Sequence, residues 1–204
     1  MNKLASIFYL RKLGLPTIYP RIVMFRNEKE IRKFVDCFYY DCDGWVLRCG
    51  RLPYMGDKME GQLPWDIAYS RDELTEKIIK LQGKVGNFYY VFCHEVKEMV
   101  KGGVMLIEGN KILIEAGFGE PKELSAMFRG KRDPEQRVVL SPGMLSFRDY
   151  SGEPVLTVSD LCELRNVERI INWEDISALT QPVSVEFSRL ARGSFYVHDI
   201  GVSG

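Results

Sequence analysis

Two carboxylates near the end of the sequence, Glu186 and Asp199, have the residue type and spacing needed to hold a metal ion. They lie in two runs of β-forming residues on either side of Arg192-Gly193, and a two-residue turn there predicts an antiparallel hairpin over 182–200. In that register Glu186 lies opposite Asp199, with the two Cβ atoms about 5 Å apart. Carboxylate oxygens on neighbouring strands suit Mg²⁺ carried by a nucleotide phosphate. A different register, or side chains that point to solvent, would make this an ordinary surface hairpin.

Positive charge that could meet phosphate oxygens follows the short apolar run 45–47. The run ends on Arg48 and continues into a loop with three glycines and two prolines, which also carries Arg51 and Lys58. Glycine lets a backbone approach a ligand closely, and both kinds of basic side chain bind phosphate oxygens. The pattern predicts a flexible loop that contacts phosphate, and the alternative is a plain surface loop.

The composition is that of a well-packed globular chain without an overall electrostatic bias. Among 204 residues, 28 are Lys or Arg and 28 are Asp or Glu, which argues against a whole-chain nucleic-acid or membrane surface. No stretch reaches the roughly 18 apolar residues of a membrane span. Five cysteines without a C-x-x-C pair support neither disulfides nor zinc, and reduced thiols indicate a cytoplasmic protein. The sequence has only two histidines, His94 and His198, which argues against a histidine-based metal site or a catalytic triad.

The elements that must position these residues mix helical and β patterns. Helices are predicted over 4–13, from about Ser159 to 171, and over 173–179. Two more helices are predicted to begin at capping boxes, one at Asn27 and one at Ser70. Strands are predicted over 22–25, 45–47, 88–92, 104–107, 111–116, 138–140 and 144–147, with a hairpin turn at Gly109-Asn110. The segment CHEVKEMV leaves a strand and is the predicted division between two lobes.

Four stretches, taken in order, resemble the ATP-grasp superfamily, and in particular the nucleotide-binding domain of phosphoenolpyruvate synthase and pyruvate phosphate dikinase. They are NKLASIFYLRKLGLPTIYP, VLRCGRLPYMGDKMEG, GFGEPKELSAMFRGKRDPEQRVV and the closing hairpin VSVEF…SFYVHDI. The resemblance implies an α+β, ATP-grasp-like fold in which two lobes with mainly antiparallel sheets close on a nucleotide site. It implies an N-terminal lobe over 1–93 and a C-terminal lobe over 94–204 that carries the metal-binding hairpin.

The resemblance assigns the metal and phosphate contacts to particular residues. Glu186 matches the family's first metal-ligand glutamate, and Asp199 falls where a Gln, Asn or Glu usually supplies the second. Arg48 matches an arginine that contacts the nucleotide phosphates, which makes it the catalytic candidate. Lys3 matches a phosphate-binding lysine. The family's Arg-Ser-Ser after this strand is replaced here by Cys49-Gly50.

Further nucleotide contacts follow from the same resemblance. Glu120 matches an acidic residue near the nucleotide, and adenine is read largely by hinge backbone, here Cys93 to Val96, which includes His94 and Glu95. The implied cofactors are ATP and Mg²⁺.

The function that follows is an ATP- and Mg²⁺-dependent phosphotransferase or ligase. The chain to Gly204 contains neither a phosphohistidine swivelling domain nor a pyruvate-binding barrel. We therefore expect a stand-alone ATP-grasp domain that acts on a separate small molecule or protein, and a separately encoded phosphohistidine domain is one candidate partner. The alternative is a non-catalytic nucleotide- or RNA-binding module, supported by the basic segment 129–137 and the aromatic run 88–90. The acidic residues Asp133 and Glu135 within the basic segment argue against nucleic acid.

Overall fold

The computed structural model describes residues 3–38, 42–51, 63–85, 89–109, 111–128, 130–141, 147–173 and 182–202. The chain divides into two compact units. Unit 1 comprises Met1–Phe8 and Ile18–Lys97, and unit 2 comprises Tyr9–Thr17 and Glu98–Gly204. The predicted lobes, 1–93 and 94–204, stay a prediction. No helix in the described part of the chain is long and apolar enough to cross a membrane.

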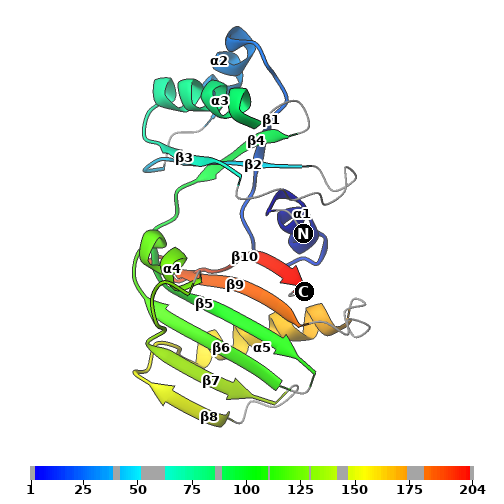
Figure 1. Cartoon of the computed structure of the whole chain (residues 1–204), viewed down its shortest axis with the longest axis vertical. Coiled ribbons are helices and arrows are strands. Elements are labelled where there is room, and N and C mark those ends of the chain that lie inside the picture. Colours follow the sequence, from blue (N-terminus) through cyan, green and yellow to red (C-terminus); the bar gives the residue numbers. More distant parts are fainter. Residues whose placement is uncertain are drawn as a thin grey trace. The chain divides into compact units, whose positions relative to one another are not determined.

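Unit 1 is an antiparallel sheet with two helices packed on one face. Its described strands are ordered β1-β4-β2-β3 (Figure 1). Buried side chains of two helices, such as Ile31 and Ile78, pack in one cluster with Trp45 and Leu47 of the sheet. The elements are α1 (Lys3–Lys12, whose last residues belong to unit 2), β1 (Arg21–Val23), α2 (Glu28–Asp36), β2 (Trp45–Gly50), β3 (Trp65–Ala68), α3 (Arg71–Val85) and β4 (Tyr90–Glu95).

The predicted helix boundaries in unit 1 are confirmed where capping residues set them. The Glu30 N–H donates to Asn27 Oδ1 at 2.9 Å, and the Glu73 N–H donates to Ser70 Oγ at 3.2 Å. Both contacts satisfy backbone donors that the first helical turn leaves without an intrahelical partner. Gly14, with φ of 72°, follows α1 in the left-handed conformation that commonly terminates a helix.

Unit 2 is a larger antiparallel sheet with the long helix α5 on one face (Figure 1). Its described strands are ordered β10-β9-β5-β6-β7-β8. Leu164 and Ile171 of α5 pack against a buried row that includes Met105, Ile114 and Val185. The elements are β5 (Met99–Glu108), β6 (Lys111–Phe118), α4 (Pro121–Phe128), β7 (Gln136–Leu140), β8 (Phe147–Gly152), α5 (Val158–Trp173), β9 (Val183–Leu190) and β10 (Phe195–Val202).

Three elements of the two units, β3, α4 and most of β8, are not predicted by the sequence patterns. Strand β3 has four residues and lies at a sheet edge, too short for an alternating pattern to emerge. Helix α4 has a proline at its first position and an acidic first turn, but its eight residues precede a basic run and read as polar loop. The predicted strand 144–147 meets β8 only at Phe147, and 142–146 lie outside the described residues. Of the predicted helix 173–179, only Trp173 is described, as the end of α5.

A buried carboxylate joins α5 to the sheet of unit 2. Asp160 is 2% exposed and accepts hydrogen bonds from Lys101 Nζ at 2.6 Å, Arg189 Nε at 2.8 Å and the Thr157 N–H at 2.8 Å. Burial alone would raise the pKa of Asp160, but the hydrogen bonds from Lys101, Thr157 and Arg189 outweigh it and lower the pKa to about 2. Arg189 also donates to the Gly193 carbonyl at 2.6 Å, so the cluster reaches the turn between β9 and β10.

We predict that Asp160→Asn lowers the free energy of unfolding by about 3 kcal/mol, because the half-buried cations of Lys101 and Arg189 lose their countercharge. Urea unfolding at pH 7 measures this change. The matched control is Glu115→Gln in the same unit, whose ion pair with Arg137 is solvent-exposed and should contribute less than about 1 kcal/mol. Equal losses in the two variants would contradict the structural role of Asp160.

Candidate functional site

The hairpin of β9 and β10 carries the predicted metal ligands, but its turn differs from the prediction. The Leu190 N–H donates to Ser194 O at 2.9 Å, which leaves the three residues Ala191–Gly193 in the loop. The predicted two-residue turn at Arg192-Gly193 is therefore wrong. Gly193 has φ of 85°, the left-handed conformation that a three-residue hairpin loop requires at its last position.

Glu186 nevertheless lies directly opposite Asp199, as the sequence predicts. The ladder shifts register between Val197 and Asp199, and this β-bulge offsets the extra turn residue. Val185 and Ile200 beside the pair are buried against α5. Because side chains alternate along a strand, Glu186 and Asp199 point to the opposite face of the sheet, called the open face below.

The donor set on the open face fits a magnesium ion. Mg²⁺ prefers oxygen ligands and is commonly held by one or two carboxylates together with water and substrate phosphate. Glu186 and Asp199 supply two carboxylates on neighbouring strands, and both are half-buried. Among the described residues no group of three or more His, Cys, Asp and Glu could hold a metal by itself. The pair would thus need phosphate and water to complete the coordination.

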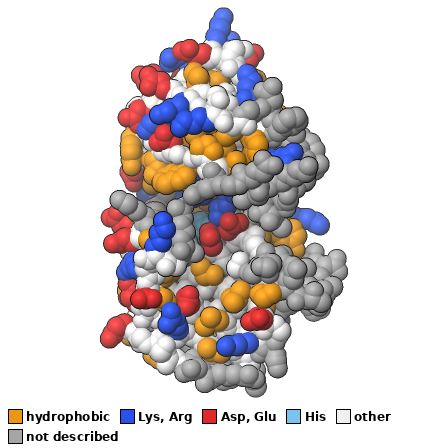
Figure 2. Space-filling model, in the orientation of Figure 1, with side chains coloured by type: hydrophobic (Ala, Val, Ile, Leu, Met, Phe, Trp, Pro, Cys, Tyr) orange, Lys and Arg blue, Asp and Glu red, His pale blue; other side chains and the backbone are white. Residues whose placement is uncertain are grey.

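The open face continues past the carboxylate pair in a single row. Glu186 lies opposite Val104 of β5, Val104 opposite Glu115 of β6, and Glu115 opposite Arg137 of β7. Arg137 Nε donates to Glu115 Oε1 at 2.8 Å. In the lower half of Figure 2, hydrophobic side chains are interspersed with acidic and basic ones.

In unit 1 the structure brings together three of the predicted nucleotide contacts, Lys3, Arg48 and His94. Arg48 lies opposite Phe92, and His94 lies opposite Val46, which places both on the sheet face away from α2 and α3. Burial, and then the nearby charges of Arg48, Lys3 and Lys97, lower the pKa of His94 to about 3. The imidazole is therefore neutral at physiological pH in a cationic environment, which an anionic ligand would complement.

The predicted hinge, Cys93 to Val96, makes several contacts of its own. His94 Nδ1 lies 3.0 Å from Glu95 O, and since a carbonyl only accepts, Nδ1 carries the hydrogen. The Val96 N–H donates to Gly44 O at 2.8 Å. Glu95 pairs with Lys97 at 2.5 Å. The Val96 N–H is thus engaged within the chain, so a base bound at this segment would use other backbone groups.

Three predicted residues remain, and the structure describes two of them, Glu120 and Arg51. Glu120 is exposed in unit 2, just before α4, and its N–H donates to Glu123 Oε2 at 3.0 Å. Arg51 lies over the ring of Tyr89, 5.8 Å from its centroid. Lys58 falls among residues 52–62, which are not described.

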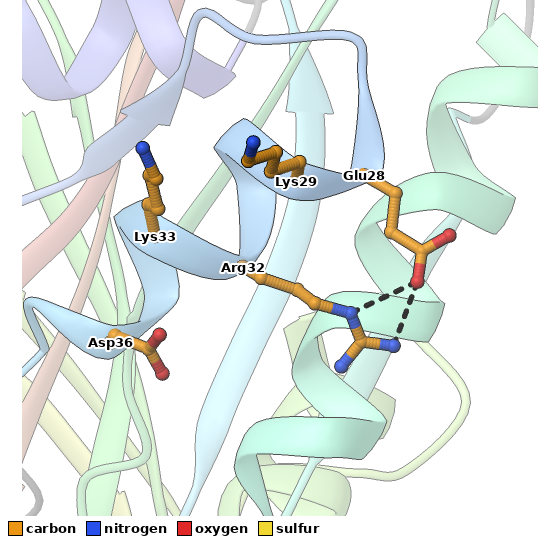
Figure 3. A pocket seen from close by; sticks show the side chains of 5 residues that line it. All are labelled: Glu28, Lys29, Arg32, Lys33 and Asp36. Atoms are coloured by element: carbon orange, nitrogen blue, oxygen red, sulfur yellow. Dashed lines mark hydrogen bonds and ion pairs between the residues drawn. The ribbon is translucent and has the colours of Figure 1, made fainter.

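Two further surface features bear on partners. In the basic segment, Arg132 donates to the Phe118 carbonyl at 3.0 Å and pairs with Glu135, so part of its charge is neutralised within the chain. A shallow hollow of about 470 Å³ lies along α2 and holds three basic and two acidic side chains (Figure 3). One of them, Arg32, is paired with Glu28 at 2.8 Å. The hollow comes from one exposed helix and gathers none of the predicted site residues.

Two contacts near the predicted site are not anticipated by the sequence patterns. Ser188 Oγ lies 2.5 Å from His198 Nε2, across the two strands that carry Glu186 and Asp199. Lys97 is the other, as one of the cations acting on His94. The alternation of polar residues along 184–188 could have indicated that Ser188 lies on the same face as Glu186. The bulge that brings His198 to Ser188 has no sequence signature.

Comparison with known proteins identifies the fold. No family model and no curated protein matches the sequence. Solved structures that the chain resembles are D-alanyl-alanine synthetase A from Vibrio cholerae (11% identity, 98% of this chain and 55% of that chain, TM-score 0.61); N5-carboxyaminoimidazole synthetase from Staphylococcus aureus with ADP (12%, 98% and 44%, 0.57); and carboxyaminoimidazole ribonucleotide synthase from Aspergillus clavatus with ATP (14%, 97% and 44%, 0.55).

The predicted α+β, ATP-grasp-like fold with mainly antiparallel sheets is confirmed by these likenesses and by the two sheets of the described residues. The chain spans about half the length of the solved structures it matches. The narrower resemblance to phosphoenolpyruvate synthase and pyruvate phosphate dikinase stays a prediction.

We predict that His94 makes the stability of unit 1 depend on pH. Its folded pKa lies below the ordinary value of 6.5, so the unfolded chain binds a proton that the folded chain does not, and stability falls as pH decreases from 6.5 toward 3. Between pH 7 and pH 5 this contribution is about 1–2 kcal/mol. The measurement is urea unfolding followed by tryptophan fluorescence.

The comparison variant for this prediction is His94→Asn, whose side-chain amide can still donate to Glu95 O but does not titrate. Other titrating groups act equally on both proteins, so the difference between the two pH profiles isolates the imidazole. Parallel profiles for the two proteins would contradict the prediction.

Proposed function

We propose that the chain is an ATP- and Mg²⁺-dependent ligase domain. The observation that carries the proposal is the placement of Glu186 opposite Asp199 on the open face of the sheet in unit 2. The likeness to two solved synthetases and a synthase, two of the three in complex with ADP or ATP, supports a nucleotide as ligand. The specific acceptor is an unidentified small molecule or protein.

In unit 2, Glu186 and Asp199 would hold Mg²⁺ through carboxylate oxygens. The ion supplies charge neutralisation for phosphate oxygens during phosphoryl transfer. Two opposed carboxylates repel one another in its absence, so their own placement favours a cation between them. Glu120, exposed just before α4, is a further candidate for a nucleotide contact.

In unit 1, Arg48 and Lys3 would bind phosphate oxygens. Their charges already lower the pKa of His94, which places both close to one neutral imidazole. An anion beside them would relieve the repulsion among these cations. Arg48 is the residue we assign to stabilising charge during transfer, while His94, Glu95 and Val96 belong to the segment proposed to contact the base.

Ligase and phosphotransferase activities differ in the fate of the transferred phosphoryl group. In a ligase, a substrate carboxylate attacks the γ-phosphorus and ADP leaves; a nucleophile then attacks the acyl carbon and inorganic phosphate leaves. A phosphotransferase would leave a stable phosphorylated product, for example on a separately encoded phosphohistidine domain. Release of inorganic phosphate together with a coupled product distinguishes the ligase, and a cytoplasmic setting fits either activity.

We predict that MgATP raises the thermal unfolding midpoint of the protein by about 5–10 °C at a ligand concentration near 100 times the dissociation constant. Glu186→Gln and Asp199→Asn should each lose the part of this increase that depends on Mg²⁺, because an amide is a much weaker ligand for a hard cation. The measurement is a thermal-shift series with ATP, with and without Mg²⁺.

The matched control for these variants is Glu115→Gln, a carboxylate of the same row on the open face that is paired with Arg137. It should retain the full Mg²⁺-dependent increase. No shift with ATP in the unmodified protein would sink the proposal. ATP binding with no ADP formed across a panel of acids and amines would favour the non-catalytic binding module instead.

A further inference from the structure

The bulge in β10 decides which face of the sheet Asp199 occupies. On the turn side of the bulge, Tyr196 pairs with Ser188 and Val197 with Phe187. Continued without a shift, this register would place His198 opposite Glu186 and Asp199 opposite Val185. Val185 is fully buried in the core beneath α5.

A slip of one residue moves every following side chain to the other face of a sheet. Without the bulge, Asp199 would therefore point into the apolar core, and Ile200 would leave it. The open face would keep Glu186 but lose its opposed carboxylate. The candidate metal site thus depends on one extra residue in β10, which the register identifies as His198.

A side-chain contact holds this extra residue. His198 Nε2 and Ser188 Oγ are 2.5 Å apart, and Ser188 lies on the open face two residues from Glu186. A β-bulge interrupts the regular backbone ladder, so side-chain contacts have more influence on the position of the bulged residue than they have elsewhere in a strand.

Ser188 is itself held in a confined place. It is fully buried and lies opposite Gly102 of β5, where an added Cβ would lie 3.3 Å from Ser188 Cβ and 3.1 Å from Leu124 Cδ1 of α4. A buried hydroxyl that loses its hydrogen-bond partner is unfavourable. The confined hydroxyl therefore favours the bulged position of His198.

We propose that Ser188 and His198 are positioning residues for the metal site: their hydrogen bond fixes the bulge that turns Asp199 toward Glu186. The inference rests on the proposed function, since it concerns the same pair of carboxylates. The role assigned to His198 is geometric and requires a hydrogen-bonding group at the place of Nε2, not a change of protonation.

The test measures Mn²⁺ binding in the presence of ATP by the relaxation enhancement of water protons, with Mn²⁺ as the paramagnetic probe for Mg²⁺. Ser188→Ala and His198→Leu should raise the dissociation constant of Mn²⁺ about tenfold, the size usual for loss of a group that orients a metal ligand. His198→Gln should stay within about twofold of the unmodified protein, because the Gln amide reaches the place of Nε2.

A matched control is Ser184→Ala, which lies two residues from Glu186 on the other side and pairs with Gly201 beyond the bulge. Its hydroxyl makes a long contact, 3.4 Å to Gly201 O, and its removal should leave Mn²⁺ affinity unchanged. Far-UV circular dichroism and the unfolding midpoint of each variant, measured without metal, separate lost positioning from lost folding.

Two results would overturn the inference: tenfold weaker binding in His198→Gln as well as in His198→Leu, or unchanged binding in both Ser188→Ala and His198→Leu. The proposed function fails in a different way, when Glu186→Gln and Asp199→Asn leave Mn²⁺ binding unchanged. If Ser188→Ala does not fold, the contrast between His198→Leu and His198→Gln still decides the inference.

Discussion

The buried carboxylate of Asp160 is the interaction on which the arrangement of unit 2 depends. A charge removed from water costs several kcal/mol unless it is paired and hydrogen-bonded, and Asp160 meets that condition through two strands and the segment just before its own helix. Lys101 comes from β5, Arg189 from β9, and Thr157 directly precedes α5. Because no single element can satisfy this carboxylate, the polar cluster fixes where α5 lies on the sheet.

The same polar cluster links the face of the sheet that packs against α5 to the hairpin that carries the candidate metal site. Arg189 donates to the carbonyl of Gly193 in the hairpin turn, so the hairpin is held at its tip by the side that packs against α5. The opposite side of β9 and β10 then carries Glu186 and Asp199, whose carboxylates would be costly in the core. Alternate residues of these two strands therefore either pack in the core or lie on the face of the candidate metal site.

In unit 1 the surroundings of an ionisable group favour its neutral form, the reverse of what is seen at Asp160. Asp160 keeps its charge because cations surround it, whereas His94 is kept neutral because burial and cations both oppose its protonation. The positive charges of Arg48, Lys3 and Lys97 act together on this neutral imidazole. This environment is the physical basis for proposing an anion near Lys3 and Arg48.

The sequence by itself determined the features that depend on neighbouring residues. The caps at Asn27 and Ser70, the turn after Glu108 and the existence of the closing hairpin all follow from local hydrogen bonding and side-chain alternation. The sequence also placed Glu186 opposite Asp199, although a turn longer by one residue and a bulge of one residue had to offset each other for that prediction to hold.

Tertiary structure decided the features that depend on residues far apart in the chain. Lys101 and Asp160 are 59 residues apart, and the cations that act on His94 come from α1, β2 and the segment after β4. The bulge at His198 belongs to the same class, because its position is set by which side chains the core accepts and by the space around Ser188. Local patterns specify elements, but burial and register are settled only when distant elements pack together.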